Sequence, residues 1–141
     1  MKKSILLLSG AVLLGFGACK KDDKNDTQAR KDLIIGTWNL SQMGIDVNDN
    51  SVLDANEATT SVVTGTVSFN ANGNVYSALN FGGGISGNDT SSWAFENNEQ
   101  VLRIIDADND TDRINVTELT ANRLVLLDKA DTLGTWQVLT K

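Results

Sequence analysis

The 141-residue chain contains no histidine and only one cysteine. Without histidine there can be no Ser-His-Asp or Cys-His nucleophilic site, no histidine-based zinc site and no imidazole base near neutral pH. A single cysteine cannot form a disulfide within the chain. Acidic residues outnumber basic ones by 18 to 12. A body of this charge repels phosphate backbones, which argues against nucleic-acid binding and favours neutral or cationic partners, metal ions included.

Long apolar runs are also scarce. The one extended run covers Ile5 to Phe16 and follows a basic start, Met1-Lys2-Lys3. It is too short to span a bilayer stably but suits the hydrophobic core of an export signal. Small residues follow the run directly before Cys19, where they would admit a signal peptidase. We therefore predict a signal peptide over residues 1–18.

The end of this segment, Phe16-Gly17-Ala18-Cys19, resembles the lipobox of bacterial lipoproteins, with phenylalanine where leucine is usual. The resemblance implies that Cys19 becomes the first residue after cleavage and carries two or three acyl chains, such as palmitate. Each buried methylene contributes about 0.8 kcal/mol, so these chains would hold the protein on a membrane. The expected location is the outer membrane, on the cell surface or the periplasmic face. The alternative is an ordinary secretory signal that contains a cysteine.

Residues 19–31 are almost wholly polar and show no periodicity, which predicts a flexible tether. Within them, Lys21-Asp22-Asp23 resembles the signal that sends lipoproteins to the cell surface in the Bacteroidetes group, and a plain solvated tether is the alternative. Loss of residues 1–18 would remove two lysines and no acids, leaving 10 basic and 18 acidic residues, so the net charge would change from −6 to −8. Thr27 to Leu33 are predicted to form one or two helical turns.

Residues 32–141 are predicted to form one all-β domain. Gly-Thr-Trp occurs both in Ile35–Leu40 and in Leu133–Leu139, and each copy is typical of a strand on a half-buried sheet. If these first and last strands pair, the sheet has no free edge. Short alternating segments joined by polar turns lie between them. We therefore predict a single small antiparallel up-and-down β-barrel of about eight strands, with the short N-terminal helix plugging one end.

The early Gly36-Thr37-Trp38 and the turn Phe69-Asn70-Ala71-Asn72-Gly73 together resemble lipocalin-like domains of small bacterial lipoproteins. This resemblance spans Leu33 to the last residue and implies an eight-stranded barrel. Such a barrel is either filled by its own side chains or holds one small ligand. Aromatic side chains are the inward candidates, namely Trp38, Phe69, Phe81, Trp93, Phe95 and Trp136. The candidate ligand contacts are Trp38, Tyr76, Phe81, Trp93 and Trp136, with core filling as the alternative.

The stretch from Asp46 to Glu57 resembles the calcium loop of EF-hand proteins, with oxygen side chains at loop positions one, three, five, nine and twelve. Position six is Ser51 where that family has glycine, and the flanks are typical of strands, so only the loop itself would be shared. The affinity would be weak, dissociating at about 10⁻⁴ to 10⁻³ M. The alternative is a polar turn. The implied calcium ligands are Asp46, Asn48, Asn50, Val52 (through its carbonyl), Asp54 and Glu57.

These features predict a membrane-anchored, monomeric and non-enzymatic protein that binds a small apolar or amphipathic ligand, with calcium in one loop. The alternative is an envelope or cell-surface lipoprotein that contacts another protein through its loops and holds no internal ligand. An acid/base hydrolase built on paired aspartates is less favoured, because the carboxylates cluster in turns rather than in a pocket.

Overall fold

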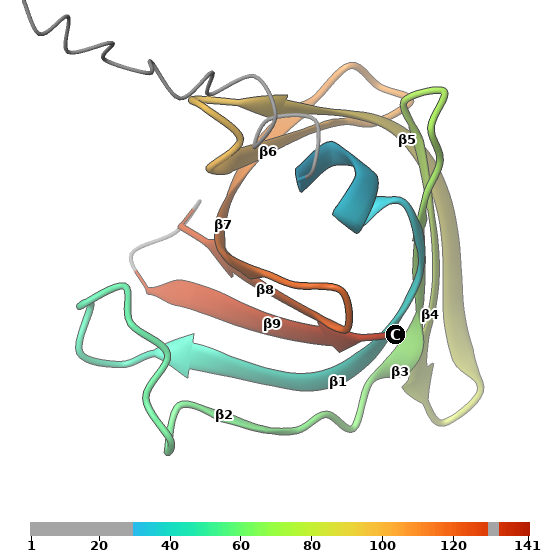
Figure 1. The fold of residues 1–141 in the computed structure, drawn as a ribbon. Helices are drawn as coiled ribbons and strands as arrows, with labels where there is room; N and C mark the ends of the chain where they lie inside the picture. Colours follow the sequence, from blue (N-terminus) through green and yellow to red (C-terminus); the bar gives the residue numbers. More distant parts are fainter. Residues whose placement is uncertain (1–29, 130–132) are drawn as a thin grey trace, which may run out of the picture.

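The computed structural model describes residues 30–129 and 133–141. The predicted signal peptide and Cys19 lie outside these residues. Seen along the barrel, the strands form a ring, and a short helical segment, residues 30–34, is seen within its outline (Figure 1). No helix within the described ranges is long and apolar enough to cross a membrane. The strands are β1 (Gly36–Asp46), β2 (Ala58–Thr60), β3 (Thr64–Phe69), β4 (Asn74–Gly82), β5 (Ile85–Glu96), β6 (Val101–Ile105), β7 (Thr111–Leu119), β8 (Arg123–Asp128) and β9 (Gly134–Thr140).

Eight of these strands form a closed antiparallel barrel. From β3 to β9 each strand pairs with the next along the chain, β1 pairs with β3, and β1 also pairs with β9. The short β2 lies beside Gln42 to Gly44 of β1, on the same side of β1 as β3. The predicted closure between the first and last strands is confirmed, and so is the up-and-down barrel.

A β-bulge at Ser41 reverses which side chains of β1 face inward. Leu40 pairs with Leu139 of the inner core, but the register then shifts, so that Gln42 pairs with Val138 on the outer face. The Ser41 hydroxyl donates a hydrogen bond to the carbonyl of Val138 (2.9 Å). A bulge adds one unpaired residue to a strand, and this exchanges the two faces beyond it. The end of β1 therefore places its last residues on the outer wall.

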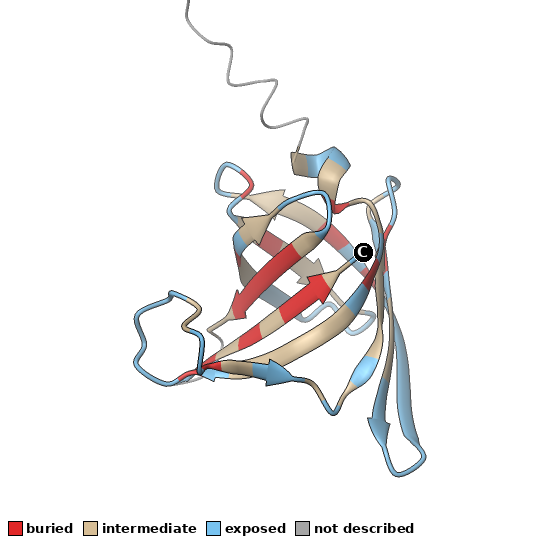
Figure 2. Ribbon diagram, turned by 60° about the horizontal axis from the view of Figure 1, so that its bottom comes forward, coloured by how far each residue is buried: buried red, intermediate tan, exposed pale blue. Residues whose placement is uncertain are grey.

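The barrel has two apolar cores that share strand β8. Leu124 and Leu126 pack inside the barrel, whereas Val125 and Leu127 pack on its outer face. Buried residues run along both β8 and β9 (Figure 2). Because side chains alternate along a strand, an unbroken apolar strand indicates burial on both faces.

The outer core lies under the segment that connects β1 with β2. Leu53 of this segment and Ala58, the first residue of β2, pack against Val125, Leu127, Trp136 and Val138. Trp136 is 0% exposed and pairs in register with Leu127 and Gly44. This placement corrects the prediction that Trp136 points inward. Its burial results from the covering segment and not from the barrel interior.

The helical segment covers one end of the barrel (Figure 2). Ile34 is fully buried, and its carbonyl accepts a hydrogen bond from Trp38 Nε1 (2.7 Å). Lys141 Nζ donates to the carbonyls of Leu33 (2.8 Å) and Ile35 (3.0 Å) and lies 4.3 Å from the centre of the Trp38 ring. A cation at the end of a helix stabilises carbonyls that have no helical partner. The predicted plug is therefore present over residues 30–34.

Gly44→Ala is expected to destabilise the protein by about 1 to 3 kcal/mol, because an added Cβ would overlap the Glu57 carbonyl oxygen and force the covering segment to shift. The free energy of unfolding, measured by urea denaturation, tests this. Gly87→Ala is the matched control, since the nearest atom to its Cβ would be a Phe81 ring carbon at 3.7 Å. Equal losses in the two variants would contradict the packing of the covering segment on β1.

Candidate functional site

A cavity of about 140 Å³ lies among the inward-facing side chains of the barrel. Seven strands contribute to its wall, from β3 to β9. The apolar part of the wall is formed by Val67, Phe69, Val75, Leu102, Ile104, Ile114 and Leu126. The polar part is formed by Ser77, Asp89, Ser91 and Gln137.

The size of this cavity limits what it can hold. An apolar protein cavity of about 150 Å³ accommodates a benzene molecule, whereas pockets for drug-sized ligands measure about 300 to 1,000 Å³. The present cavity therefore matches a single ring or a short chain. A long acyl chain or a haem would not fit without a rearrangement of the wall.

Aromatic side chains fill the part of the barrel beside the cavity. Trp93 meets Phe69 and Phe95 edge to face, with ring centres 5.6 Å and 5.7 Å apart. Its Nε1 donates to the carbonyl of Asn70 (3.1 Å). Trp38 is fully buried in the same inner core. Trp38 and Trp93 thus face inward as predicted, but they act as filling, and only Phe69 among the aromatic residues lines the cavity.

Two further candidate contacts lie away from the cavity. Tyr76 is 43% exposed and pairs in register with Ser68 and Thr90. Its neighbour Ser77 faces the cavity, so alternation directs Tyr76 outward. Phe81 is 51% exposed on the β4–β5 hairpin, which extends beyond the barrel (Figure 2). These positions correct the prediction that Tyr76 and Phe81 line the interior.

The polar residues of the cavity were not foreseen from the sequence. Ser77 and Asp89 are direct cross-strand partners in β4 and β5, and Ser91 is two residues further along β5. Gln137 comes from β9, across the barrel. The alternation in β4, with Val75 inward, is the signal that could have placed Ser77 on the inner face. The inward position of Asp89 follows only once β4 and β5 are paired.

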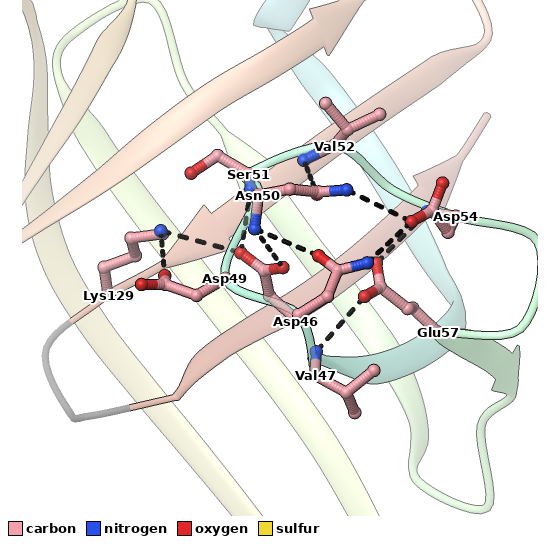
Figure 3. Close-up of polar contacts among 10 residues, drawn as sticks. Asp46, Val47, Asp49, Asn50, Ser51, Val52, Asp54, Glu57 and Lys129 are labelled. Carbon is pink, nitrogen blue, oxygen red and sulfur yellow. Dashed lines mark hydrogen bonds and ion pairs between the residues drawn. The ribbon is translucent and has the colours of Figure 1, made fainter.

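The loop from Asp46 to Glu57 brings the side chains of the predicted calcium ligands together on the outer face of the barrel (Figure 3). Asp46 is 0% exposed, and its carboxylate accepts hydrogen bonds from the amides of Asn50 (3.2 Å) and Ser51 (3.0 Å). Glu57 is also buried and accepts from the amides of Val47 and Asp54, both at 3.1 Å. Two buried carboxylates thus organise the backbone of the loop.

The other predicted ligands form a second set of contacts in this loop. Asp54 Oδ2 accepts from the side-chain amides of Asn48 (2.9 Å) and Asn50 (3.2 Å). Ser51, at the sixth loop position, has a φ of 59°. This is the left-handed conformation that a glycine would adopt without strain, so the backbone bends where the EF-hand resemblance requires it.

Lys129 supplies the positive charge beside this loop. Its Nζ lies 2.6 Å from Asp49 Oδ1 and 3.6 Å from Asp46 Oδ2. The hydrogen bond to Asp49 raises the pKa of the Lys129 amine. Among the residues that the structure describes, no three acidic, histidine or cysteine side chains are arranged to hold a metal ion. With the loop in this arrangement, its carboxylates are engaged by amides and by the lysine.

The comparison with family models supports this fold. A model described as a lipocalin-like domain matches residues 34–126, which is 93 of the 141 residues of the chain. The chain therefore belongs to the lipocalin-like domain family. No curated protein matches it.

Solved structures from Bacteroides share the fold. A lipocalin-like protein from Bacteroides uniformis is 15% identical and superposes with a TM-score of 0.55 over 77% of this chain and 98% of its own. An uncharacterized protein from Bacteroides eggerthii is 15% identical, with a TM-score of 0.53 and the same two coverages. At this identity the likeness establishes the fold. Lipocalin-like folds typically bind small ligands and are not typically enzymes.

Proposed function

We propose that this protein binds a small, mainly apolar ligand in its barrel and has no enzymatic activity. The observation that carries the proposal is the cavity of about 140 Å³, enclosed by a closed barrel and lined mostly by apolar side chains. A ligand of six to eight non-hydrogen atoms would bury much of its apolar surface there. The corresponding dissociation constant is roughly 0.1 to 1 mM, or about 4 to 5.5 kcal/mol, which is within the range for ligands of this size.

Toluene is expected to bind and to raise the melting temperature of the protein, because its ring gains contacts with the apolar part of the cavity wall in the folded state only. Ile104 lines the cavity, so Ile104→Phe is expected to fill the space and abolish the shift. Val62→Phe is the matched control, since Val62 is 89% exposed and lies away from the cavity. Absence of a shift in near-saturated toluene would reject the internal ligand. That result would favour the alternative, in which the protein contacts another envelope protein through its loops and holds no internal ligand.

We further propose that the protein is anchored to the outer membrane by acyl chains on Cys19, facing either the cell surface or the periplasm. The lipobox-like sequence before Cys19 supports this proposal, together with the polar residues that follow it. The described chain begins at residue 30, in the helical segment at one end of the barrel. A tether attached there would leave the opposite end, with the β4–β5 hairpin, directed away from the bilayer.

Cys19→Ser is expected to release the protein from the membrane fraction and to abolish the incorporation of labelled palmitate, because serine has no sulfur to acylate. Membrane fractionation of bacteria producing each variant measures both effects. Ser9→Ala, within the predicted signal peptide, is the control and should remain labelled. An unlabelled but exported wild-type protein would instead indicate an ordinary secretory signal.

We also propose that the loop from Asp46 to Glu57 binds calcium weakly as a structural ion. The support is a short loop that carries Asp46, Asp54 and Glu57 and has a left-handed bend at Ser51, with the Asp46 and Glu57 carboxylates turned toward the loop backbone. Calcium takes six to eight oxygen ligands, so binding would require the asparagine amides to rotate and present their oxygens. It would also require Lys129 to withdraw from Asp46, since the two cations would repel each other.

Calcium at about 10 mM is expected to stabilise the wild-type protein by about 1 to 2 kcal/mol, as a ligand present at roughly ten times its dissociation constant would. Thermal unfolding with calcium or magnesium measures this. Glu57→Gln is expected to lose the calcium-dependent increment. Asp106→Asn, in a different acidic turn, is the control and should retain it. If calcium does not raise the stability of the wild-type protein, the calcium proposal is wrong.

A further inference from the structure

Three of the four polar residues of the cavity lie on two adjacent strands, and the fourth, Gln137, lies on β9. Ser77 of β4 and Asp89 of β5 are cross-strand partners, and Ser91 of β5 pairs with Val75, which also lines the cavity. Side chains at alternate positions of paired strands share one face of the sheet. The two hydroxyls and the carboxylate therefore form one polar patch on an otherwise largely apolar wall.

Asp89 lies where this patch meets solvent. It is exposed, whereas Ser91 is buried. Its Oδ2 accepts a hydrogen bond from the Ser91 hydroxyl (3.0 Å), and its Oδ1 accepts from the amide of Thr90 (2.8 Å). These contacts hold the carboxylate at the edge of the cavity. Because each carboxylate oxygen accepts more than one hydrogen bond, Asp89 retains capacity for another donor.

No basic side chain in the described part of the chain forms an ion pair with Asp89. The ion pairs that are present join Arg103, Arg113, Arg123 and Lys129 to other acids. The protein as a whole carries a net charge of −6, so its overall field favours cations over anions. A carboxylate beside a low-dielectric cavity attracts cations and repels anions, the more so because apolar walls concentrate the field.

We infer that the ligand of this cavity is a small apolar amine, with its ring or chain inside the barrel and its ammonium group at Asp89. The inference rests on the proposed function and deepens it. The ammonium group donates to the Asp89 carboxylate and to the hydroxyls of Ser77 and Ser91. The apolar part contacts Leu102, Ile114 and Leu126 on the facing strands. Carboxylic acids of the same size are disfavoured at this opening.

Four probes share one aromatic ring and differ in its substituent: toluene, benzyl alcohol, benzylamine and benzoate. Their affinities separate the contribution of the apolar ring from that of a neutral, a cationic or an anionic group. In the wild-type protein, benzylamine is expected to bind about tenfold more tightly than benzyl alcohol, because a hydrogen bond to a charged group is stronger than one between neutral groups. Benzoate is expected to bind more weakly than benzyl alcohol. Raising the salt from about 20 to about 200 mM should reduce the preference for benzylamine and leave toluene binding unchanged.

Asp89→Asn is expected to abolish the preference for benzylamine over benzyl alcohol, because the amide keeps the shape of the side chain and loses its charge. Asp108→Asn is the matched control: it removes the same charge from an exposed turn that does not line the cavity. Ser91→Ala provides a second variant, in which loss of the bond to Asp89 should lower the preference in part. Thermal melting of each variant without probe verifies that it is folded.

The outcomes distinguish this inference from the proposed function. If toluene does not bind, the internal site fails and the amine inference fails with it. If toluene binds but benzylamine and benzyl alcohol bind equally, the apolar site stands and the inference is overturned. A preference that survives Asp89→Asn, or that Asp108→Asn lowers to the same extent, also overturns it. Either of these last two results would show that benzylamine is attracted by the overall negative charge of the protein and is not recognised by Asp89.

Discussion

Backbone hydrogen bonds between β1 and β9 join the first and last strands of the barrel, from Asn39 paired with Thr140 to Asp46 paired with Gly134. They remove the free edges of the sheet and enclose an interior. The bulge at Ser41 lies within this pairing and separates an inward-facing start of β1, with Trp38, from an outward-facing end. Closure at this seam encloses the interior that holds the cavity, and the outward-facing end of β1 leads into the acidic loop on the outer face.

Much of the fold could be predicted from the sequence, because the features that determine it are local or repeated. Gly-Thr-Trp at both ends of the domain indicated two equivalent strands, and the Asn-Gly turn after Phe69 indicated a hairpin. Trp136 could not be placed in the same way. Alternation in its strand places Trp136 with Val138 and opposite to Thr135 and Gln137, so periodicity indicates that Trp136 is buried but not which side of the barrel wall buries it. The direction is determined by the pairing of β9 with β8 and by the segment that covers them.

The candidate site likewise contains some contacts that are local in sequence and others that depend on strand pairing. In the outer loop, Asp46 accepts from the amide of Asn50 and Glu57 from that of Asp54, contacts between residues close in sequence that a polar turn of this composition favours. Asp89 lies in a stretch rich in Gly, Asn, Asp and Ser, which resembles a loop. Such residues are depleted in strands, yet pairing with β4 extends β5 back to Ile85 and turns Asp89 toward the cavity. Tertiary pairing overrides local propensity there, and no local pattern reveals it.

Strand β8 assigns consecutive residues to opposite sides of the wall: Leu126 lines the internal cavity, and Leu127 packs with Leu53 of the segment outside it. A single substitution at one of these positions alters one compartment and leaves the neighbouring side chain in place. Substitutions that change the lining of the internal cavity and substitutions that change the support of the outer loop can therefore accumulate independently during evolution. Related barrels with the same backbone would then be expected to differ in the lining of the cavity while retaining the outer loop, or the reverse.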